Sequence, residues 1–176
     1  MKPIALIPHY NHGATLATVC TALRAHGLPV LVIDDGSNVA DLAAARELAA
    51  HDPAITLLER AHNGGKGAAV KDGIHWATQQ GYSHALQIDA DGQHDFADIP
   101  RFLAAGQQHP DALICGRPVY SADAPKSRLY GRKISNFWIW INTGSHDIPD
   151  GMCGYRLYPV ATTAALLRRH YTGNRM

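Results

Sequence analysis

Residues 16–33, LATVCTALRAHGLPVLVI, decide the fold class of this chain. Their first half places apolar side chains at the i, i+3, i+4 and i+7 spacing of one helical face, at Leu16, Val19, Cys20 and Leu23. Gly27 and Pro29 then end the predicted helix, and the apolar run Val30–Ile33 begins a buried strand directly afterwards. A helix that leads straight into a buried strand is typical of an α/β fold.

The same alternation continues on both sides of this segment. Further short apolar runs predict strands at Ile4–Ile7, Ile55–Leu58, Ala85–Ile88 and Ala112–Cys115. Longer segments with helical periodicity predict helices near residues 39–50, 66–80, 97–108 and 159–170. This order of elements predicts a mostly parallel central sheet. A chain of 176 residues with 46% hydrophobic content can bury one core, so we expect a single domain over residues 1–176.

Charge and composition limit the classes of partner. Sixteen Lys and Arg against fifteen Asp and Glu give a formal net charge of +1, with no block of like charges. This balance argues against nucleic acid or anionic lipid as the main partner. No apolar run approaches the roughly 18 to 20 residues that cross a bilayer. The three cysteines follow no disulfide or zinc pattern. We therefore expect a cytoplasmic protein with no transmembrane segment in this chain.

Polar residues gather where the predicted strands end. Tyr10 and Asn11 follow the first strand, Asp34 and Asp35 the second, Asp89 and Asp91 the fourth, and Arg117 the fifth. In open α/β sheets this carboxyl edge holds the ligand. The sequence therefore predicts one binding site built from several strand ends.

The aspartates at the end of the fourth predicted strand indicate a metal site. Asp89 and Asp91 are one residue apart, so both carboxylates can face one pocket after the turn. Two carboxylates suit Mg²⁺ or Mn²⁺, which takes further ligands from water and substrate phosphates. Gln93 or His94 would complete the shell. The alternative is an ordinary turn, in which Asp95 or Asp98 caps the following helix.

Two other turns indicate a nucleotide. Asp34 and Asp35 are adjacent like charges, which favours a partner such as a base or ribose donor, although an ordinary capped turn remains the alternative. The segment Asn63-Gly64-Gly65-Lys66-Gly67 precedes a helix, where backbone amides and Lys66 can hold anionic oxygens. It matches neither a P-loop nor a dinucleotide fingerprint. A plain flexible loop is the alternative here.

Five motifs occur together in order along nearly the whole chain. They are Pro8-His9-Tyr10-Asn11, Ile33-Asp34-Asp35-Gly36-Ser37, Asn63-Gly64-Gly65-Lys66-Gly67, Asp89-Ala90-Asp91-Gly92-Gln93-His94 and Asp150-Gly151-Met152-Cys153-Gly154-Tyr155-Arg156. Together they resemble family 2 glycosyltransferases, particularly the branch that includes dolichyl-phosphate mannose synthase and polyprenyl-phosphate glycosyltransferases. The resemblance implies a GT-A fold with three α/β/α layers and inversion at the sugar carbon.

The resemblance also implies roles for individual residues. The nucleotide-sugar contacts would be Pro8, Tyr10, Asn11, Asp34, Asp35, Lys66 and Asp89. The metal shell would be Asp89, Asp91 and Gln93. Arg117, with Arg128 or Arg132, would meet the diphosphate or an acceptor phosphate. Asp150 would face the acceptor and act as general base if the acceptor is an alcohol, whereas a phosphate acceptor is already ionised near neutral pH.

The expected activity is transfer of a sugar from a nucleoside-diphosphate sugar to a lipid phosphate, a lipid or a saccharide of the cell envelope, with peripheral association at the inner face of the membrane. The chain departs from the family at His12, where Glu is usual, and at Cys153-Gly154-Tyr155-Arg156, where Ser-Gly-Phe-Arg is usual. Relatives continue beyond the position of Met176, so we expect a catalytic domain shortened at its C-terminus. A sugar-phosphate nucleotidyltransferase and a non-catalytic nucleotide-sugar-binding relative are the alternatives.

Overall fold

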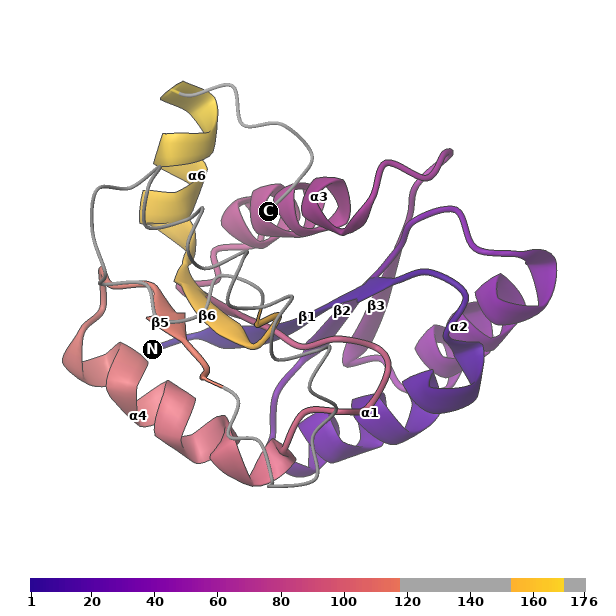
Figure 1. Cartoon of the computed structure of the whole chain (residues 1–176), viewed down its shortest axis with the longest axis horizontal. Coiled ribbons are helices and arrows are strands. Elements are labelled where there is room, and N and C mark those ends of the chain that lie inside the picture. The colour runs from indigo at the N-terminus through magenta and orange to yellow at the C-terminus, as the bar shows by residue number, and fades with distance from the viewer. Residues whose placement is uncertain (118–152, 170–176) are drawn as a thin grey trace, which may run out of the picture. The chain divides into compact units, whose positions relative to one another are not determined.

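The structure is a computed structural model that describes residues 1–117 and 153–169 (Figure 1). Its strands are β1 Pro3–His9, β2 Val30–Asp34, β3 Ile55–Glu59, β4 His84–Gln87, β5 Ile114–Cys115 and β6 Arg156–Pro159. Its helices are α1 Gly13–Ala25, α2 Val39–His51, α3 Lys66–Gln79, α4 Ile99–Gln108 and α6 Val160–Arg169, with a 3-10 turn at Phe96–Asp98.

The chain divides into two compact units. The first comprises Met1–Ile114 and Tyr155–Met176, and the second comprises Cys115–Gly154. The first unit contains all five helices named above and most of the sheet. Most of the second unit lies outside the described residues, so the single domain over 1–176 stays a prediction.

The central sheet has six strands in the order β3-β2-β1-β4-β6-β5. β1 pairs in parallel with β2 and β4, and β2 pairs in parallel with β3. β6 is antiparallel to β4. The prediction of a mostly parallel sheet is therefore confirmed, and the carboxyl ends of β1, β2, β3 and β4 meet at one edge.

Helices cover both faces of this sheet, which confirms the three α/β/α layers. In Figure 1, α1, α2 and α4 lie on one side of the strands, and α3 and α6 lie on the other. The contacts agree, because α3 packs on β1, β2 and α6, whereas α4 packs on β6 and α1 packs on α2. No helix in the described part of the chain is both long and apolar enough to cross a membrane.

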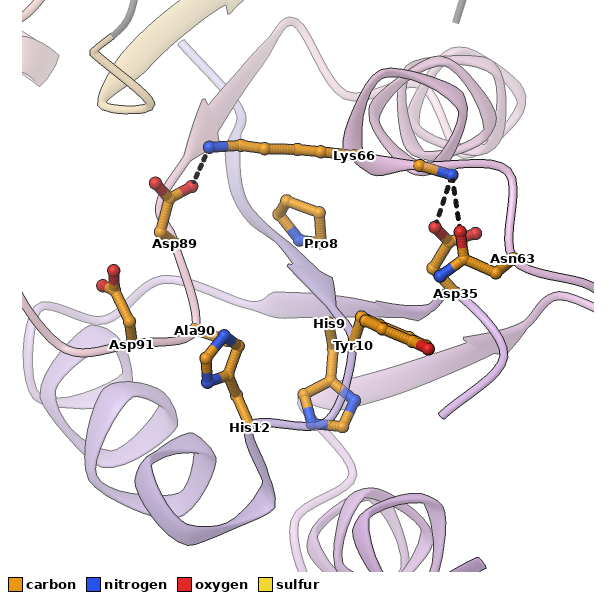
Figure 2. A pocket seen from close by; sticks show the side chains of 11 residues that line it. Pro8, His9, Tyr10, His12, Asp35, Asn63, Lys66, Asp89, Ala90 and Asp91 are labelled. Carbon is orange, nitrogen blue, oxygen red and sulfur yellow. Dashed lines mark hydrogen bonds and ion pairs between the residues drawn. The ribbon is translucent and has the colours of Figure 1, made fainter. Parts of the chain in front are cut away.

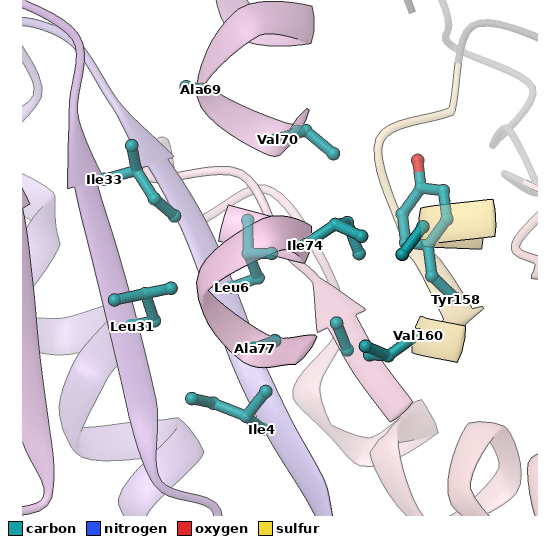
Figure 3. Close-up of a cluster of buried hydrophobic side chains, with 12 residues drawn as sticks. Ile4, Leu6, Leu31, Ile33, Ala69, Val70, Ile74, Ala77, Tyr158 and Val160 are labelled. Atoms are coloured by element: carbon teal, nitrogen blue, oxygen red, sulfur yellow. The ribbon is translucent and has the colours of Figure 1, made fainter. Parts of the chain in front are cut away.

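Alternating strand residues form the two core layers. Ile4 and Leu6 of β1 and Leu31 and Ile33 of β2 are buried in one cluster, shown in Figure 3. Val70, Ile74 and Ala77 of α3 and Tyr158 of β6 complete much of this layer. The intervening strand residues, such as Ala5, Ile7 and Val32, are buried as well. The apolar face predicted for α1 is confirmed, since Leu16, Val19, Cys20 and Leu23 are all buried.

Three elements differ from the sequence prediction. The predicted helix at 97–108 begins only at Ile99, because Asp95 accepts a hydrogen bond from the Ala97 amide (2.9 Å) and caps a 3-10 turn first. The strand predicted at 112–115 is confined to Ile114–Cys115, since the Ala112 amide donates to the His109 carbonyl in a turn (3.0 Å). Strand β6 was missed, because four residues are too few to show a period.

Gly73 sets the distance between α3 and the sheet. A Cβ at this position would lie 2.6 Å from Leu6 Cδ1 and 3.1 Å from Ile33 Cδ1. We expect Gly73→Val to lower the free energy of unfolding by at least about 2 kcal/mol, because overpacking a close-packed core forces side chains and backbone to shift. Denaturant unfolding measures the loss. His75→Ala, on the exposed face of the same helix, should stay within about 0.5 kcal/mol of the parent; equal stability of both variants would contradict the packing argument.

Candidate active site

A cavity of about 440 Å³ opens at the carboxyl edge of the sheet. Its walls come from the ends of β1, β2 and β4 and from the turn before α3: Pro8, His9, Tyr10, His12, Asp35, Asn63, Gly65, Lys66, Asp89, Ala90 and Asp91. We call it the donor cavity, after the nucleotide-sugar donor that the motif resemblance implies. In Figure 2, Asp35 and Asn63 lie on one side of the donor cavity and Asp89 and Asp91 on the other, with Pro8 between them. The structure therefore brings together residues that are far apart in the sequence, as the strand-end pattern predicted.

The two adjacent aspartates at the end of β2 have different environments. Successive strand side chains point to opposite faces, so Asp34 and Asp35 separate at the strand end. Asp35 lines the donor cavity, whereas Asp34 does not. Both are buried, with 1% of Asp34 and 3% of Asp35 exposed.

Asp34 stabilises the turn behind the donor cavity. Its Oδ1 lies 2.9 Å from His9 Nδ1, and its Oδ2 accepts hydrogen bonds from the backbone amides of Gly36 (3.2 Å) and Ser37 (3.1 Å). Burial raises the pKa of Asp34, but the hydrogen bonds with Ser37 and the contact with His9 outweigh it, so the pKa lies below its ordinary value. A direct nucleotide contact by Asp34 stays a prediction, and its observed contacts are structural.

This arrangement makes stability depend on pH. At pH 7, Asp34→Asn should cost about 1 to 3 kcal/mol, because the buried amides lose a charged acceptor. The folded pKa is the lower one, so the carboxylate's contribution is present above the unfolded value of about 4 and is lost as pH falls through the folded value. Chemical unfolding of the parent and of Asp34→Asn, measured from pH 7 to pH 2, should show that the difference between their free energies of unfolding becomes smaller in acid. A constant difference would contradict the role of the charge.

Asp35 holds the glycine turn that precedes α3. Its Oδ1 accepts a hydrogen bond from the Gly64 amide (3.0 Å) and its Oδ2 from the Gly65 amide (2.8 Å). The guanidinium of Arg60 forms an ion pair with the same carboxylate. Two amides that the sequence offered as anion ligands are thus used by Asp35. The predicted nucleoside contact of Asp35 is untested, although its position in the donor cavity suits it.

Sequence reasoning missed Arg60. It directly follows β3, so the strand-end rule applied to the third strand would have found it. Its Nη1 contacts Asp35 and its Nε lies 2.6 Å from Asp72 Oδ2. Nothing local in the sequence predicts these partners, because Asp35 and Asp72 are each 12 or more positions away.

The two residues after β1 have different roles. Tyr10 lines the donor cavity and is 47% exposed, so its ring is available to a ligand. Asn11 does not line it, and its backbone adopts a positive φ of 56°. The Asn11 amide donates to Ser37 Oγ (3.0 Å), and its side-chain oxygen accepts from the Asn38 amide (2.9 Å). Asn11 thus joins the turns after β1 and β2, and its predicted nucleotide contact stays a prediction.

The neighbours of Asp89 shift the pKa of its carboxyl group. Lys66 Nζ lies 2.5 Å from its Oδ1, as Figure 2 shows, and His94 Nε2 lies 3.4 Å from its Oδ2. Burial raises the pKa of Asp89, but the contact with His94 and the charge of Lys66 outweigh it and lower the pKa to about 2. His94 is itself held against the ring of Tyr155, with centroids 5.0 Å apart. Asp89 is therefore ionised at physiological pH.

The residues present fit a divalent cation only in part. Asp91 lines the donor cavity beside Asp89, and its Oδ1 accepts a hydrogen bond from the Gln93 amide (3.0 Å). The exposed Gln93 does not line it. Within residues 1–117 and 153–169, no three His, Cys, Asp or Glu side chains form a metal cluster. Two carboxylates on one cavity fit an Mg²⁺ or Mn²⁺ ion that takes its other ligands from water and phosphate.

Of the predicted catalytic residues, the described part of the chain includes Arg117, which does not line the donor cavity. Arg117 is exposed and belongs to the second unit. Arg132 and Asp150, like Arg128, lie outside the described residues. Their roles stay predictions that rest on the motif resemblance.

The family follows from comparison with known proteins. The family model described as glycosyl transferase family 2 matches residues 4–174. The chain belongs to this family. The match covers nearly all of the chain, including the motifs that line the donor cavity, and the GT-A fold expected from these motifs is confirmed.

Two similar curated proteins have names that refer to mannose and polyprenyl lipids. The chain is 33% identical to a polyprenol monophosphomannose synthase of Mycolicibacterium smegmatis, over 88% of this chain and 62% of the relative. It is 32% identical to an undecaprenyl-phosphate mannosyltransferase of Micrococcus luteus, over 94% of this chain and 70% of that protein. The chain thus spans roughly two thirds of the length of these relatives.

A solved structure from Thermus thermophilus, named mannose-1-phosphate geranyltransferase, has a similar fold. It aligns with 97% of this chain and 61% of its own length, with a TM-score of 0.60 and 18% identity. At this identity the likeness concerns the fold alone.

Proposed function

We propose that this chain is the catalytic region of an inverting glycosyltransferase that moves a sugar from a nucleoside-diphosphate sugar to a lipid phosphate. The observation that carries the proposal is Asp89, held ionised beside Lys66 in a cavity that Asp35 and Asp91 also line. The cavity has carboxylates on two sides and a lysine across it. This arrangement suits a ligand that has hydrogen-bond donors at one end and a diphosphate at the other. The names of the curated relatives support the lipid-phosphate acceptor.

The donor cavity has two chemically different ends. Asp35, Tyr10 and Asn63 form the end that suits a nucleoside, with an aromatic ring and hydrogen-bond acceptors. Asp89, Asp91 and Lys66 form the end that suits a diphosphate and its metal. Mg²⁺ or Mn²⁺ bound there would neutralise the charge of the departing diphosphate. The sugar would then lie beyond the diphosphate, on the side of the cavity away from Asp35.

The reaction is a displacement at the anomeric carbon. An oxygen of the acceptor phosphate forms a bond to this carbon, the bond to the diphosphate oxygen breaks, and the nucleoside diphosphate leaves with the electron pair. The chain's own contribution is binding and charge: Lys66 can pass from Asp89 to a phosphate oxygen, and Asp89 remains ionised above pH of about 2. A phosphate acceptor needs no general base. Asp150 would then orient the acceptor, and Arg117 and Arg132 would attract its charge.

The acceptor places the reaction at a membrane surface. A polyprenyl phosphate stays in the bilayer, so the enzyme would meet its phosphate group at the cytoplasmic face. We propose peripheral association there in place of a spanning segment within this chain. The nucleoside end of the cavity suits several bases, because a carboxylate and an exposed tyrosine can contact more than one kind of nucleoside.

The proposal is tested by donor binding and transfer together. Calorimetry with UDP, GDP and dTDP, each with and without Mn²⁺, should show micromolar binding of one nucleotide that depends on the metal. The matching radiolabelled nucleotide sugar should then label undecaprenyl phosphate in detergent micelles. Binding of a nucleoside triphosphate and sugar phosphate with pyrophosphate release would instead identify a nucleotidyltransferase. Metal-dependent binding without any transfer would identify a non-catalytic relative.

A further inference from the structure

Arg60 lies between two carboxylates that belong to different parts of the fold. Its Nε is 2.6 Å from Asp72 Oδ2 on α3, and its Nη1 contacts Asp35 at the end of β2. Asp35 lines the donor cavity, whereas neither Arg60 nor Asp72 does. The guanidinium thus connects the outer surface of α3 to a carboxylate of the donor cavity.

The guanidinium also fixes the glycine turn before α3. A Cβ at Gly64 would lie 2.8 Å from Arg60 Nη1 and 2.9 Å from Nη2, so the planar group packs directly against the turn. A Cβ at Gly36 would lie 3.0 Å from the Asn63 amide nitrogen, which shows that the turns after β2 and β3 pack backbone to backbone. Asp35 joins the same turns through the Gly64 and Gly65 amides. The nucleoside end of the donor cavity therefore depends on where the guanidinium lies.

Asp72 does not line the donor cavity, and it contacts the residues around that cavity through its ion pair with Arg60. It lines a second cavity of about 500 Å³ on the outer side of β3 and α3, together with Glu59, Arg60, His62, His75 and Trp76. Its side chain is 49% exposed and that of Arg60 is 20% exposed. An ion pair this open contributes little to global stability. Its effect is geometric, because the rigid fork of an arginine is oriented by the carboxylates it meets.

We propose that Asp72 is a positioning residue for donor binding: it holds Arg60 against Asp35 and the Gly64–Gly65 turn, and so shapes the nucleoside end of the donor cavity. This inference rests on the proposed function, because it concerns the affinity for the nucleotide part of the donor. Without Asp72, the guanidinium is free to turn toward solvent, and Asp35 loses its one side-chain cation among the described residues.

The test compares nucleotide affinity and folding in the full chain. Asp72→Asn keeps the size of the side chain and removes its charge. With UDP, GDP and dTDP as probes in the presence of Mn²⁺, the dissociation constant of the nucleotide that the parent binds should rise roughly three- to tenfold. The donor KM should rise more than kcat falls, and the melting temperature should change no more than in the control. Glu59→Gln is the matched control, since it breaks the neighbouring Arg46–Glu59 ion pair (2.6 Å) and should shift the dissociation constant less than twofold.

A second variant shows whether Asp72 acts through the arginine. Arg60→Lys alone should weaken nucleotide binding at least as much as Asp72→Asn does. In the double variant, Asp72→Asn should weaken binding less than twofold further, because the guanidinium that Asp72 orients is already absent. Unchanged affinity in Asp72→Asn, or a full additional loss in the double variant, would overturn the inference. Failure of the parent to bind any of the three nucleotides would instead contradict the proposed function.

Discussion

Asp89→Asn should lower the rate of sugar transfer by at least about 100-fold, because the variant loses a ligand of the metal that would neutralise the departing diphosphate, and losing one preorganised electrostatic group usually costs about 100- to 1,000-fold. The carboxylate lies within 2.5 Å of Lys66 Nζ and has a pKa of about 2, so the parent keeps its full negative charge at the reaction pH. Asparagine has nearly the same shape but is neutral and a poor ligand for Mg²⁺ or Mn²⁺. Single-turnover transfer with saturating donor measures the loss.

The matched control for this variant lies nine residues along the same segment. Asp98→Asn removes an exposed carboxylate that pairs with Arg101 (2.8 Å) and does not line the donor cavity. Its transfer rate should equal that of the parent. Calorimetry should also show that Mn²⁺ no longer strengthens nucleotide binding in Asp89→Asn. Full-speed transfer by Asp89→Asn would exclude Asp89 from the metal site.

Asp35→Ala should affect both folding and donor binding. The change removes the acceptor of the Gly64 and Gly65 amides and one of the two carboxylates that hold Arg60. Removing one partner of a largely buried ion pair costs about 3 to 5 kcal/mol, and the solvent exposure of Arg60 places this case at or below the lower end. Nucleotide affinity should fall at least about tenfold, since the turn that shapes the nucleoside end of the cavity is released. Denaturant unfolding and nucleotide calorimetry measure the two effects.

A control variant at a second carboxylate separates the effect on folding from the effect on nucleotide binding. Asp41 also accepts a hydrogen bond from a backbone amide, that of Gly13 (2.7 Å), but it does not line the donor cavity. Asp41→Ala should therefore lose stability and keep its nucleotide affinity. If Asp35→Ala loses only stability, in the same way, then Asp35 is a turn residue and the nucleoside end of the cavity lies elsewhere.

The backbone amides of the glycine turn before α3 have other partners than those of an anion-binding loop. A sequence such as Asn63-Gly64-Gly65-Lys66-Gly67 before a helix suggests free amides for phosphate oxygens. In the structure, the Gly64 and Gly65 amides donate to Asp35, and the φ of 86° at Gly65 lets the chain make this close approach. The Lys66 ammonium at the start of α3 instead spans the cavity to Asp89 (2.5 Å), where a phosphate contact by Lys66 stays a prediction.

Much of the fold was predictable because its signals are local. Between Leu16 and Leu23, apolar residues recur every three to four positions, which predicts a helix. A glycine and a proline then end this helix before the strand that begins at Val30. Residue spacing and helix-ending residues alone therefore define these two elements. Strand β6 was not predictable in this way, because Arg156–Pro159 is a short antiparallel strand whose identity depends on its pairing with β4. The first residue of α4 and the extent of β5 likewise depended on the hydrogen bonds of the Asp95 side chain and the Ala112 amide.

The sequence by itself determined that polar residues would meet at the carboxyl edge of a parallel sheet, since the apolar runs define where strands end and their alternation with helices predicts parallel strands. Only the tertiary structure decided which of these residues face the cavity. Asp34 and Asp35 are chemically identical neighbours, yet the pleat turns one toward His9 and the other toward the Gly64–Gly65 turn. Arg60 contacts Asp35 and Asp72 because the parallel crossovers place their elements side by side. Such contacts join residues distant in sequence, and no local pattern encodes them.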